Sequence, residues 1–427
     1  MLLEFNVTNY RSIGEKQILS LIPAAKQRDF PDNIIQLQGY EALNAVSVYG
    51  ANGSGKSNVL MAFVLFNEIV RISARLSSTS PLPFEPFMLR EGWTQKPTRF
   101  EVIFVLNGLR YRYGFEFTTT VQSEWLHRKG PGREVPVFLR ENDVIDATSS
   151  FKAPAALING AIDATRDNGL FLSSCDAFNI EEGKEIFRWF DSLKVINGLN
   201  DAEQAQQTLE MWDDIEYRAH IIDFMTRMKT GFSNMDILIE DKDDGPTHHS
   251  DIKPGLERYN RKKRIPMAYH HIYDWQGKKT TDQIMWRFDA QESAGTNRAL
   301  QLSGPILWTL LKGGLLIVDE LEANLHPIMT LDTINLFLDN TINKNDAQIL
   351  FATHDTNLLT YAELRRDQIY FAEKNDWEST EIYSLSDFVY VGDTPGVKSR
   401  ERPDTDKEKR YIEGRYGAIP MLGKLNI

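Results

Sequence analysis

Cysteine is almost absent from this 427-residue chain, in which Cys175 stands alone. A lone cysteine excludes an intrachain disulfide and a cysteine-rich zinc site. Long apolar runs are missing too, because stretches such as residues 59–66 fall far short of the ~18–20 residues of a membrane helix. The first residues show no basic region followed by an apolar stretch and a cleavage site, so no secretion signal is visible. These absences predict a cytoplasmic protein without a membrane span.

Positive charge is also in deficit, since 48 Lys and Arg face 60 Asp and Glu, for a net charge of −12. This balance excludes a surface built to coat nucleic acid everywhere, which needs an excess of Lys and Arg. Arg258 and residues 261–264 are a candidate for a local basic patch that binds nucleic acid. A solvated loop with alternating charge blocks is the plainer interpretation of these residues. The chain lacks a sustained heptad pattern and an internal repeat, so it encodes neither a coiled-coil arm nor a solenoid.

What is present is a globular composition, with 42% hydrophobic and 25% charged residues. Apolar runs at residues 45–49, 315–318 and 348–352 are typical of buried strands, and helical stretches separate them. This alternation predicts a largely parallel sheet. Helical patterns at residues 181–193 and from 201 to about 228 predict a helical lobe in the middle of the chain.

Residues 50–57 read Gly-Ala-Asn-Gly-Ser-Gly-Lys-Ser and lie between an apolar strand and an apolar helix. The glycines let backbone N–H groups curl around phosphates, and the positive end of the following helix faces the same anion. Lys56 should neutralise the β- and γ-phosphate charges, and the Ser57 hydroxyl should ligate Mg²⁺. An ordinary glycine loop is the alternative. The residues predicted to bind ATP here are Gly50, Asn52, Gly53, Ser54, Gly55, Lys56, Ser57 and Asn58.

Asp319 and Glu320 directly follow the apolar run at residues 315–318. A magnesium nucleotide site needs a carboxylate at the end of a neighbouring strand, and Asp319 fits this metal role beside Ser57. Glu320 can reach the attacking water as general base or orienting group. Alone, an apolar run followed by Asp-Glu is often only a strand end with a solvated edge. Together with the phosphate loop, it predicts the catalytic carboxylates.

Two further motifs carry polar side chains at predicted element ends. His354 follows the strand at residues 348–352 and could hydrogen-bond the γ-phosphate, although a lone histidine is more often structural. Ser293 and Gly295 lie in a small polar turn ahead of an apolar helix, and such a helix start can bind a phosphate. Its plainer interpretation is a helix cap. Because the chain already has a phosphate loop, the turn would serve a second subunit.

In order, these elements resemble the nucleotide-binding domain of ABC-type ATPases, particularly the branch with SMC-like heads. Two heads of that family hold two ATP molecules between them, which implies that Ser293 and Gly295 act in trans within a homodimer or higher homo-oligomer. The resemblance makes Glu320 the catalytic glutamate, residues 321–324 the loop that crosses the dimer and His354 the switch histidine.

The opening residues 6–13, Asn-Val-Thr-Asn-Tyr-Arg-Ser-Ile, look like the start of these heads, where Arg11 and Ser12 would lie near the nucleotide. Two features depart from the family. The signature reads Glu-Ser-Ala-Gly-Thr rather than the Leu-Ser-Gly-Gly-Gln of transporters, and no glutamine can be assigned to the loop that couples ATP to the helical lobe.

The match is closer still to bacterial ATPases of the abortive-infection or overcoming-lysogenization-defect type, without a Toprim nuclease domain because only 56 residues follow Phe371. It implies an ATP-hydrolysing switch in anti-phage defence that controls an effector protein from a neighbouring gene. An SMC-like-head ATPase acting on DNA in maintenance or repair is the alternative. The segments that carry this resemblance are residues 166–173, 292–296, 318–327 and 414–420.

The fold expected from these motifs is α/β, an ABC-type ATPase head with mixed and parallel β-sheets, a P-loop and an inserted helical lobe. The expected segments are residues 1–135 and 291–427 as the two parts of the ATPase lobe, residues 136–235 as the helical lobe, and residues 236–290 as a polar loop with return strands.

Overall fold

The structure is a computed structural model that describes residues 1–25, 27–196, 202–228, 231–241, 262–391, 398–400 and 406–420. Its mixture of helices with antiparallel and parallel sheets confirms the predicted α/β class. The chain forms two compact units. Unit 1 comprises Met1–Val195, Thr309–Glu322 and Thr330–Ile427, and unit 2 comprises Ile196–Trp308 and Ala323–Met329.

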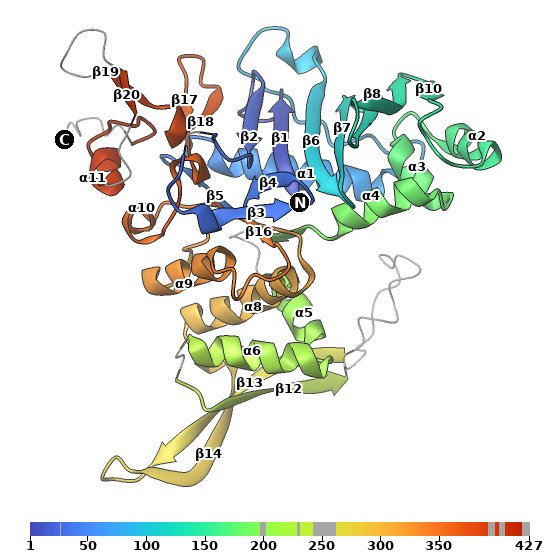
Figure 1. Cartoon of the computed structure of the whole chain (residues 1–427). Helices are drawn as coiled ribbons and strands as arrows, with labels where there is room; N and C mark the ends of the chain where they lie inside the picture. Colours follow the sequence, from blue (N-terminus) through green and yellow to red (C-terminus); the bar gives the residue numbers. More distant parts are fainter. Residues whose placement is uncertain are drawn as a thin grey trace. The chain divides into compact units, whose positions relative to one another are not determined.

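An antiparallel sheet in unit 1 has the strand order β10-β9-β8-β7-β6-β1-β2 (Figure 1). On β7, Tyr111, Tyr113 and Phe115 are buried while Arg110 and Arg112 are partly exposed, the alternation of a sheet with one covered face. The strands are β1 (Leu2–Thr8), β2 (Gln17–Ser20), β6 (Thr98–Leu106), β7 (Leu109–Phe117), β8 (Val121–Lys129), β9 (Val135–Glu141) and β10 (Val144–Ala147).

The second sheet of unit 1 has the order β11-β15-β16-β5-β17-β18. Strands β15, β16, β5 and β17 pair in parallel, and β18 returns antiparallel to β17. Because parallel strands point the same way, their carboxyl ends meet at one edge of the sheet. The strands are β5 (Ala45–Tyr49), β11 (Lys194–Ile196), β15 (Leu315–Val318), β16 (Gln348–Ala352), β17 (Ile369–Lys374) and β18 (Thr380–Ser384).

Helix α1 (Lys56–Ile72) lies in the hydrophobic core of unit 1, which also takes in side chains from both sheets. Phe63 and Phe66 are fully buried, and the Phe63 ring meets that of Phe5 edge to face at 4.6 Å. Among the described residues, one helical segment, Lys56–Arg75, is long and apolar enough to cross a membrane. Burial in the core accounts for this apolar character.

Helices α2 (Ala155–Ala164), α3 (Phe171–Ala177) and α4 (Glu181–Asp191) also belong to unit 1. Glu124 of β8 is fully buried, and its carboxylate accepts hydrogen bonds from the Tyr113 hydroxyl (2.9 Å) and the N–H groups of Phe171 (2.7 Å) and Leu172 (3.0 Å). These bonds anchor the start of α3 to the antiparallel sheet. The helical lobe expected over residues 136–235 is therefore divided, and unit 2 begins only at Ile196.

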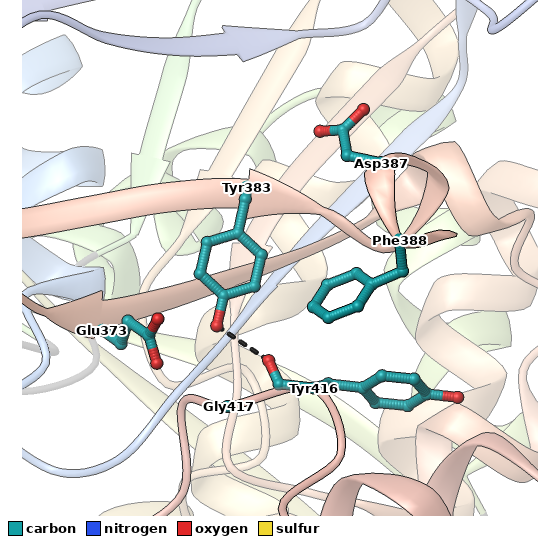
Figure 2. Close-up of a pocket in the computed structure, with 6 residues that line it drawn as sticks. All are labelled: Glu373, Tyr383, Asp387, Phe388, Tyr416 and Gly417. Carbon is teal, nitrogen blue, oxygen red and sulfur yellow. Dashed lines mark hydrogen bonds between the residues drawn. The ribbon is translucent and has the colours of Figure 1, made fainter. Parts of the chain in front are cut away.

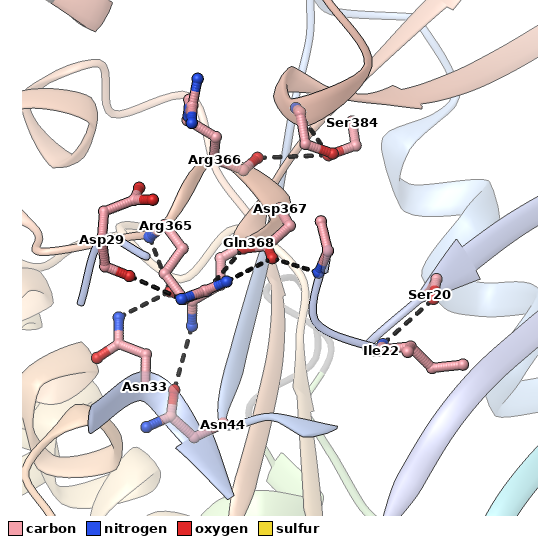
Figure 3. Close-up of polar contacts among 12 residues, drawn as sticks. Ser20, Ile22, Asp29, Asn33, Asn44, Arg365, Arg366, Asp367, Gln368 and Ser384 are labelled. Atoms are coloured by element: carbon pink, nitrogen blue, oxygen red, sulfur yellow. Dashed lines mark hydrogen bonds and ion pairs between the residues drawn. The ribbon is translucent and has the colours of Figure 1, made fainter. Parts of the chain in front are cut away.

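Buried polar side chains fix the amino end of β17 (Figure 3). Arg365 donates two hydrogen bonds of 2.9 Å to the Asp367 carboxylate. Gln368 accepts from Asn33 Nδ2 (2.7 Å) and donates to Asn44 Oδ1 (3.1 Å), just ahead of β5. These bonds hold β17 beside β5 and so set where its carboxyl end lies along the phosphate loop.

Unit 2 departs from one expectation. The helical pattern from residue 201 to about 228 is interrupted between α5 and α6, where Asp214 caps α6 by accepting from the Glu216 N–H (2.9 Å). Within residues 236–290, expected as a polar loop with return strands, residues 242–261 lie outside the described residues. The elements are α5 (Ala202–Met211), α6 (Ile215–Arg227), β12 (Asn234–Asp241), β13 (Lys262–Tyr273), β14 (Lys279–Arg287), α7 (Phe288–Gln291) and α8 (Ala294–Lys312), whose last residues belong to unit 1.

The described segment at residues 406–420 packs onto the parallel sheet. Figure 2 shows the Tyr383 hydroxyl directed at the Tyr416 carbonyl, to which it donates a hydrogen bond of 2.8 Å. The open pocket beside them includes no residue predicted to bind nucleotide. The remaining elements are β3 (Ile34–Leu37), β4 (Tyr40–Leu43), α9 (Pro327–Leu338), α10 (Asn357–Tyr361), β19 (Val389–Val391), β20 (Lys398–Arg400), α11 (Lys407–Ile412) and 3₁₀ turns at Pro31–Asn33, Ser73–Arg75, Trp93–Gln95, Arg366–Gln368 and Leu385–Asp387.

Candidate active site

Predicted site motifs follow three neighbouring strands at the carboxyl edge of the parallel sheet. Strand β5 leads into the phosphate loop at residues 50–57, β15 into Asp319 and Glu320, and β16 into His354. The sequence interpretation set the carboxylates on a strand beside the loop strand, but β16 lies between β15 and β5. Strand β16, which His354 follows, thus lies between the strand that precedes the phosphate loop and the strand that precedes Asp319 and Glu320.

The phosphate loop depends on glycine at its first residue and at the residue before α1. A Cβ on Gly50 would overlap the carbonyl oxygen of Ala372 on β17. Gly55 has a φ of 99°, and a Cβ there would overlap Thr380 Oγ1. Gly55 directly precedes α1, so the N–H groups of the first helical turn have no partner within the helix and are available to an anion.

Lys56 lies inside this loop, 5% exposed, with its Nζ donating to the Gly50 carbonyl at 2.7 Å. Burial lowers the pKa of the ammonium to about 8, against the opposing attraction of Asp319, Glu322 and Glu320. The lysine and these carboxylates therefore form one electrostatic cluster.

The pKa of Lys56 predicts a pH dependence of ATP binding. Phosphate groups favour the charged form of the Lys56 ammonium. Above pH ~8 the lysine must therefore take up a proton when ATP binds, and the affinity for ATP falls. The Kd for ATP should be nearly constant below pH 8 and rise by up to about tenfold per pH unit above it. Titration calorimetry across pH checks this. The Lys56→Arg variant, which stays charged, should lose the dependence, and a slope that persists in it contradicts the assignment.

Asp319 and Ser57, the residues predicted to hold Mg²⁺, lie in contact. Burial raises the pKa of the Asp319 carboxyl. The Ser57 hydroxyl lies close enough to the Asp319 carboxylate to lower its pKa, while Asp319 Oδ1 is buried and has no hydrogen-bond partner among the described residues. An orphaned carboxylate oxygen beside a hydroxyl suits a hard cation. The described residues hold no group of three His, Cys, Asp or Glu side chains able to bind a metal, so Mg²⁺ would take its other ligands from phosphates and water.

Glu320 and His354 join the same cluster. Glu320 has a φ of 51°, a left-handed conformation that residues other than glycine rarely adopt, as at functional turns. It is close enough to affect the pKa of both Lys56 and His354. Desolvation of the ring and the Lys56 charge lower the pKa of His354, which favours a neutral imidazole at pH 7. A neutral imidazole retains one N–H that can donate to a phosphate.

The structure adds Glu322, which lies in the loop predicted to cross the dimer but is not among the predicted site residues. One of its carboxylate oxygens accepts a hydrogen bond from the His354 backbone N–H, and the other is buried without a partner among the described residues. Glu322 therefore ties the turn after β15 to the turn after β16. Its signal in the sequence is its place in residues 321–324, two residues after Glu320.

The two residues predicted at the opening of the chain have different surroundings. Ser12 lies against the loop helix, since its hydroxyl accepts from Asn58 Nδ2 (2.7 Å) and lies 2.8 Å from Thr380 Oγ1. Arg11 forms an ion pair with Glu85 instead, and the two residues also share a backbone hydrogen bond of 2.7 Å. The structure thus brings Ser12 to the loop but engages Arg11 with Glu85.

The predicted signature turn lies in unit 2. Ser293 caps α8, because its hydroxyl accepts the Thr296 N–H at 3.1 Å, as the helix-cap interpretation expects. A Cβ on Gly295 would lie 3.0 Å from the Asn324 carbonyl, so the turn packs closely against the loop predicted to cross the dimer. Glu292 occupies the position where transporters have leucine, and its side chain is hydrogen-bonded to residues outside the turn. Its carboxylate accepts from His270 Nε2 and Trp286 Nε1, both at 2.7 Å.

Residues 46–360 match the model of a family described as "AAA domain, putative AbiEii toxin, Type IV TA system". This match spans well over half of the chain, from the phosphate loop to His354. The chain belongs to this AAA-domain family. The expected resemblance of the AAA domain to ATPases of the abortive-infection group is thereby confirmed.

No curated protein matches this AAA-domain chain in sequence. Among solved structures it is similar to "Crystal structure of the SmcHead bound to the C-winged helix domain of ScpA", at 12% identity and a TM-score of 0.46, covering 90% of this chain and 97% of that chain.

Proposed function

We propose that the chain is an ATPase that binds MgATP at the carboxyl edge of its parallel sheet. The observation that carries this proposal is the cluster of Lys56, Asp319, Glu320 and His354 around the phosphate loop. Lys56, Asp319 and Glu320 each affect the pKa of another member, and all three affect the pKa of His354. Such a set supplies a cation for phosphate charge, a metal carboxylate and a group for the attacking water, as phosphoryl transfer requires.

The roles of the chain's own groups follow from where they lie. Loop N–H groups and the start of α1 cradle the phosphates, and Lys56 exchanges the Gly50 carbonyl for β- and γ-phosphate oxygens. Ser57 and Asp319 hold Mg²⁺, which when bound neutralises charge on the phosphoryl oxygens. Glu320 orients the attacking water or accepts its proton, and His354 donates its N–H to the γ-phosphate.

The other half of the site comes, in this proposal, from a second copy of the chain, so that ATP drives formation of a homodimer or higher homo-oligomer. Two features support this. The chain already has one phosphate-binding helix start at α1, and the Ser293-capped start of α8 offers a second, with its partial positive charge. Hydrolysis then releases the pair, which makes ATP turnover a conformational switch.

The family description, which names an AbiEii toxin of a type IV TA system, supports a role in bacterial abortive infection. We place the chain there as the ATPase or sensor that controls an effector from a neighbouring gene. Co-purification with the adjacent gene product tests this, and finding no complex with or without ATP counts against it. The DNA alternative gains no support from Arg264 of the basic patch, because this arginine pairs with Asp213.

Phosphate release by the purified chain tests the enzymatic core of the proposal. Lys56→Ala should weaken ATP binding by about 100-fold, because it removes a buried charge that would hold the phosphates. Lys184→Ala, which breaks the exposed contact with Glu181 on α4, serves as the matched control and should behave like the wild type. Equal turnover in the wild type and Lys56→Ala refutes the proposed site.

A further inference from the structure

Thr380 lies at the P-loop edge of the parallel sheet although it is far from the loop in sequence. Strand β17 runs parallel to β5, so its carboxyl end reaches the edge where the phosphate loop begins. Strand β18 turns back from there, and Thr380 is its first residue, paired with Lys374. The hairpin thus delivers a hydroxyl to the loop from the side opposite β16.

The Thr380 side chain is fully buried and makes its contacts with the loop and its flank. Its hydroxyl donates to the Ser54 carbonyl at 2.9 Å and lies 2.8 Å from the Ser12 hydroxyl. A hydroxyl has one hydrogen, so Thr380 must accept from Ser12, which in turn accepts from Asn58 at 2.7 Å. The Thr380 N–H also donates to the Ser12 carbonyl at 2.8 Å. A continuous chain of hydrogen bonds therefore runs from α1 to the middle of the loop.

Gly55 shows how closely this hydroxyl approaches the phosphate-binding backbone. The residue precedes α1 with a φ of 99°, and a Cβ there would overlap Thr380 Oγ1. The loop backbone therefore curls directly over the threonine. Ser54 and Gly55 belong to the loop whose N–H groups face the anion. By bonding the Ser54 carbonyl, the Thr380 hydroxyl fixes the orientation of this backbone.

We propose that Thr380 is a positioning residue that holds the phosphate loop in its curled conformation before nucleotide binds; this rests on the proposed ATPase function. A loop ordered in advance loses little conformational entropy on binding. The hydroxyl acts equally on bound ATP and on the transition state. Its removal should therefore raise KM and leave kcat nearly unchanged.

The test compares steady-state ATP hydrolysis and thermal unfolding in Thr380→Val, Thr380→Ser and the wild type. Thr380→Val removes the hydroxyl at nearly constant volume and should raise KM about tenfold, while Thr380→Ser should restore it. Thr148→Val is the matched control, because it also removes a hydroxyl hydrogen bond, to the Pro136 carbonyl at 2.7 Å, outside the site. It should lower stability without raising KM.

The outcomes separate this proposal from the proposed function. If Lys56→Ala loses turnover while Thr380→Val keeps the wild-type KM, the positioning role is wrong and the ATPase assignment stands. If Thr380→Val is too unstable to assay, Ser12→Ala, which removes the neighbouring hydroxyl, must raise KM at least about threefold, and an unchanged KM overturns the role. If Lys56→Ala has wild-type turnover, the proposed site itself fails.

Discussion

Glu320→Gln should lower steady-state phosphate release by about 10²–10⁴-fold, the range that a general base contributes, and leave ATP affinity close to that of the wild type. The amide keeps the shape of the side chain but can no longer accept a proton from water. Because Asp319 and Ser57 remain, the metal site is preserved. The variant should also accumulate as an ATP-bound dimer, visible as a shift in mass by light scattering that reverses when ATP is removed.

Two controls make this result specific. Glu141→Gln changes an exposed glutamate of β9 and should be indistinguishable from the wild type. Glu322→Gln keeps an amide oxygen that can accept from the His354 N–H, so it should retain most of its turnover. Normal turnover in Glu320→Gln together with its loss in Glu322→Gln would move the base to Glu322.

Ser293→Asp should abolish turnover although α8 keeps its cap. Aspartate caps helices as well as serine does, so the stability of the protein should change little. The aspartate charge would, however, repel the γ-phosphate of the ATP bound by a second copy of the chain. Ser293→Asn, capping but neutral, is the matched control and should lose far less activity. Turnover of Ser293→Asp equal to that of Ser293→Asn would contradict a role at the phosphate.

Mixing inactive variants tests whether the signature acts in trans. In a 1:1 mixture of Lys56→Ala and Ser293→Asp chains, half of the dimers are mixed, and each has one intact site out of two, so activity should return to about a quarter of the wild-type value. A site completed within one chain predicts no recovery, because each chain then carries one defect. Recovery is read as phosphate release after the two variants are combined.

Three adjacent strands of the sheet that carries the site could be predicted closely because they are short, mostly apolar and followed by polar motifs. The predicted strands at residues 45–49, 315–318 and 348–352 have the bounds of β5, β15 and β16. The order of the strands could not be read in the same way. Each strand is buried on both faces, so its residue pattern does not indicate which strand lies beside it.

The supporting residues could not be predicted because they come from distant segments. Thr380 reaches Ser54 only through the β17–β18 hairpin, and Glu322 reaches His354 only because β15 and β16 are adjacent. The helical pattern at residues 181–193 does not indicate that this helix packs on the antiparallel sheet, since an apolar helix face does not specify its partner.

A structure of the chain with Mn²⁺ and a non-hydrolysable ATP analogue tests the central claim most directly, because anomalous scattering locates the manganese. We expect one manganese peak within coordination distance of Ser57 Oγ, beside the Asp319 carboxylate, with the phosphates enclosed by residues 50–57. Nucleotide bound elsewhere on the chain, or manganese remote from both Ser57 and Asp319, would contradict it.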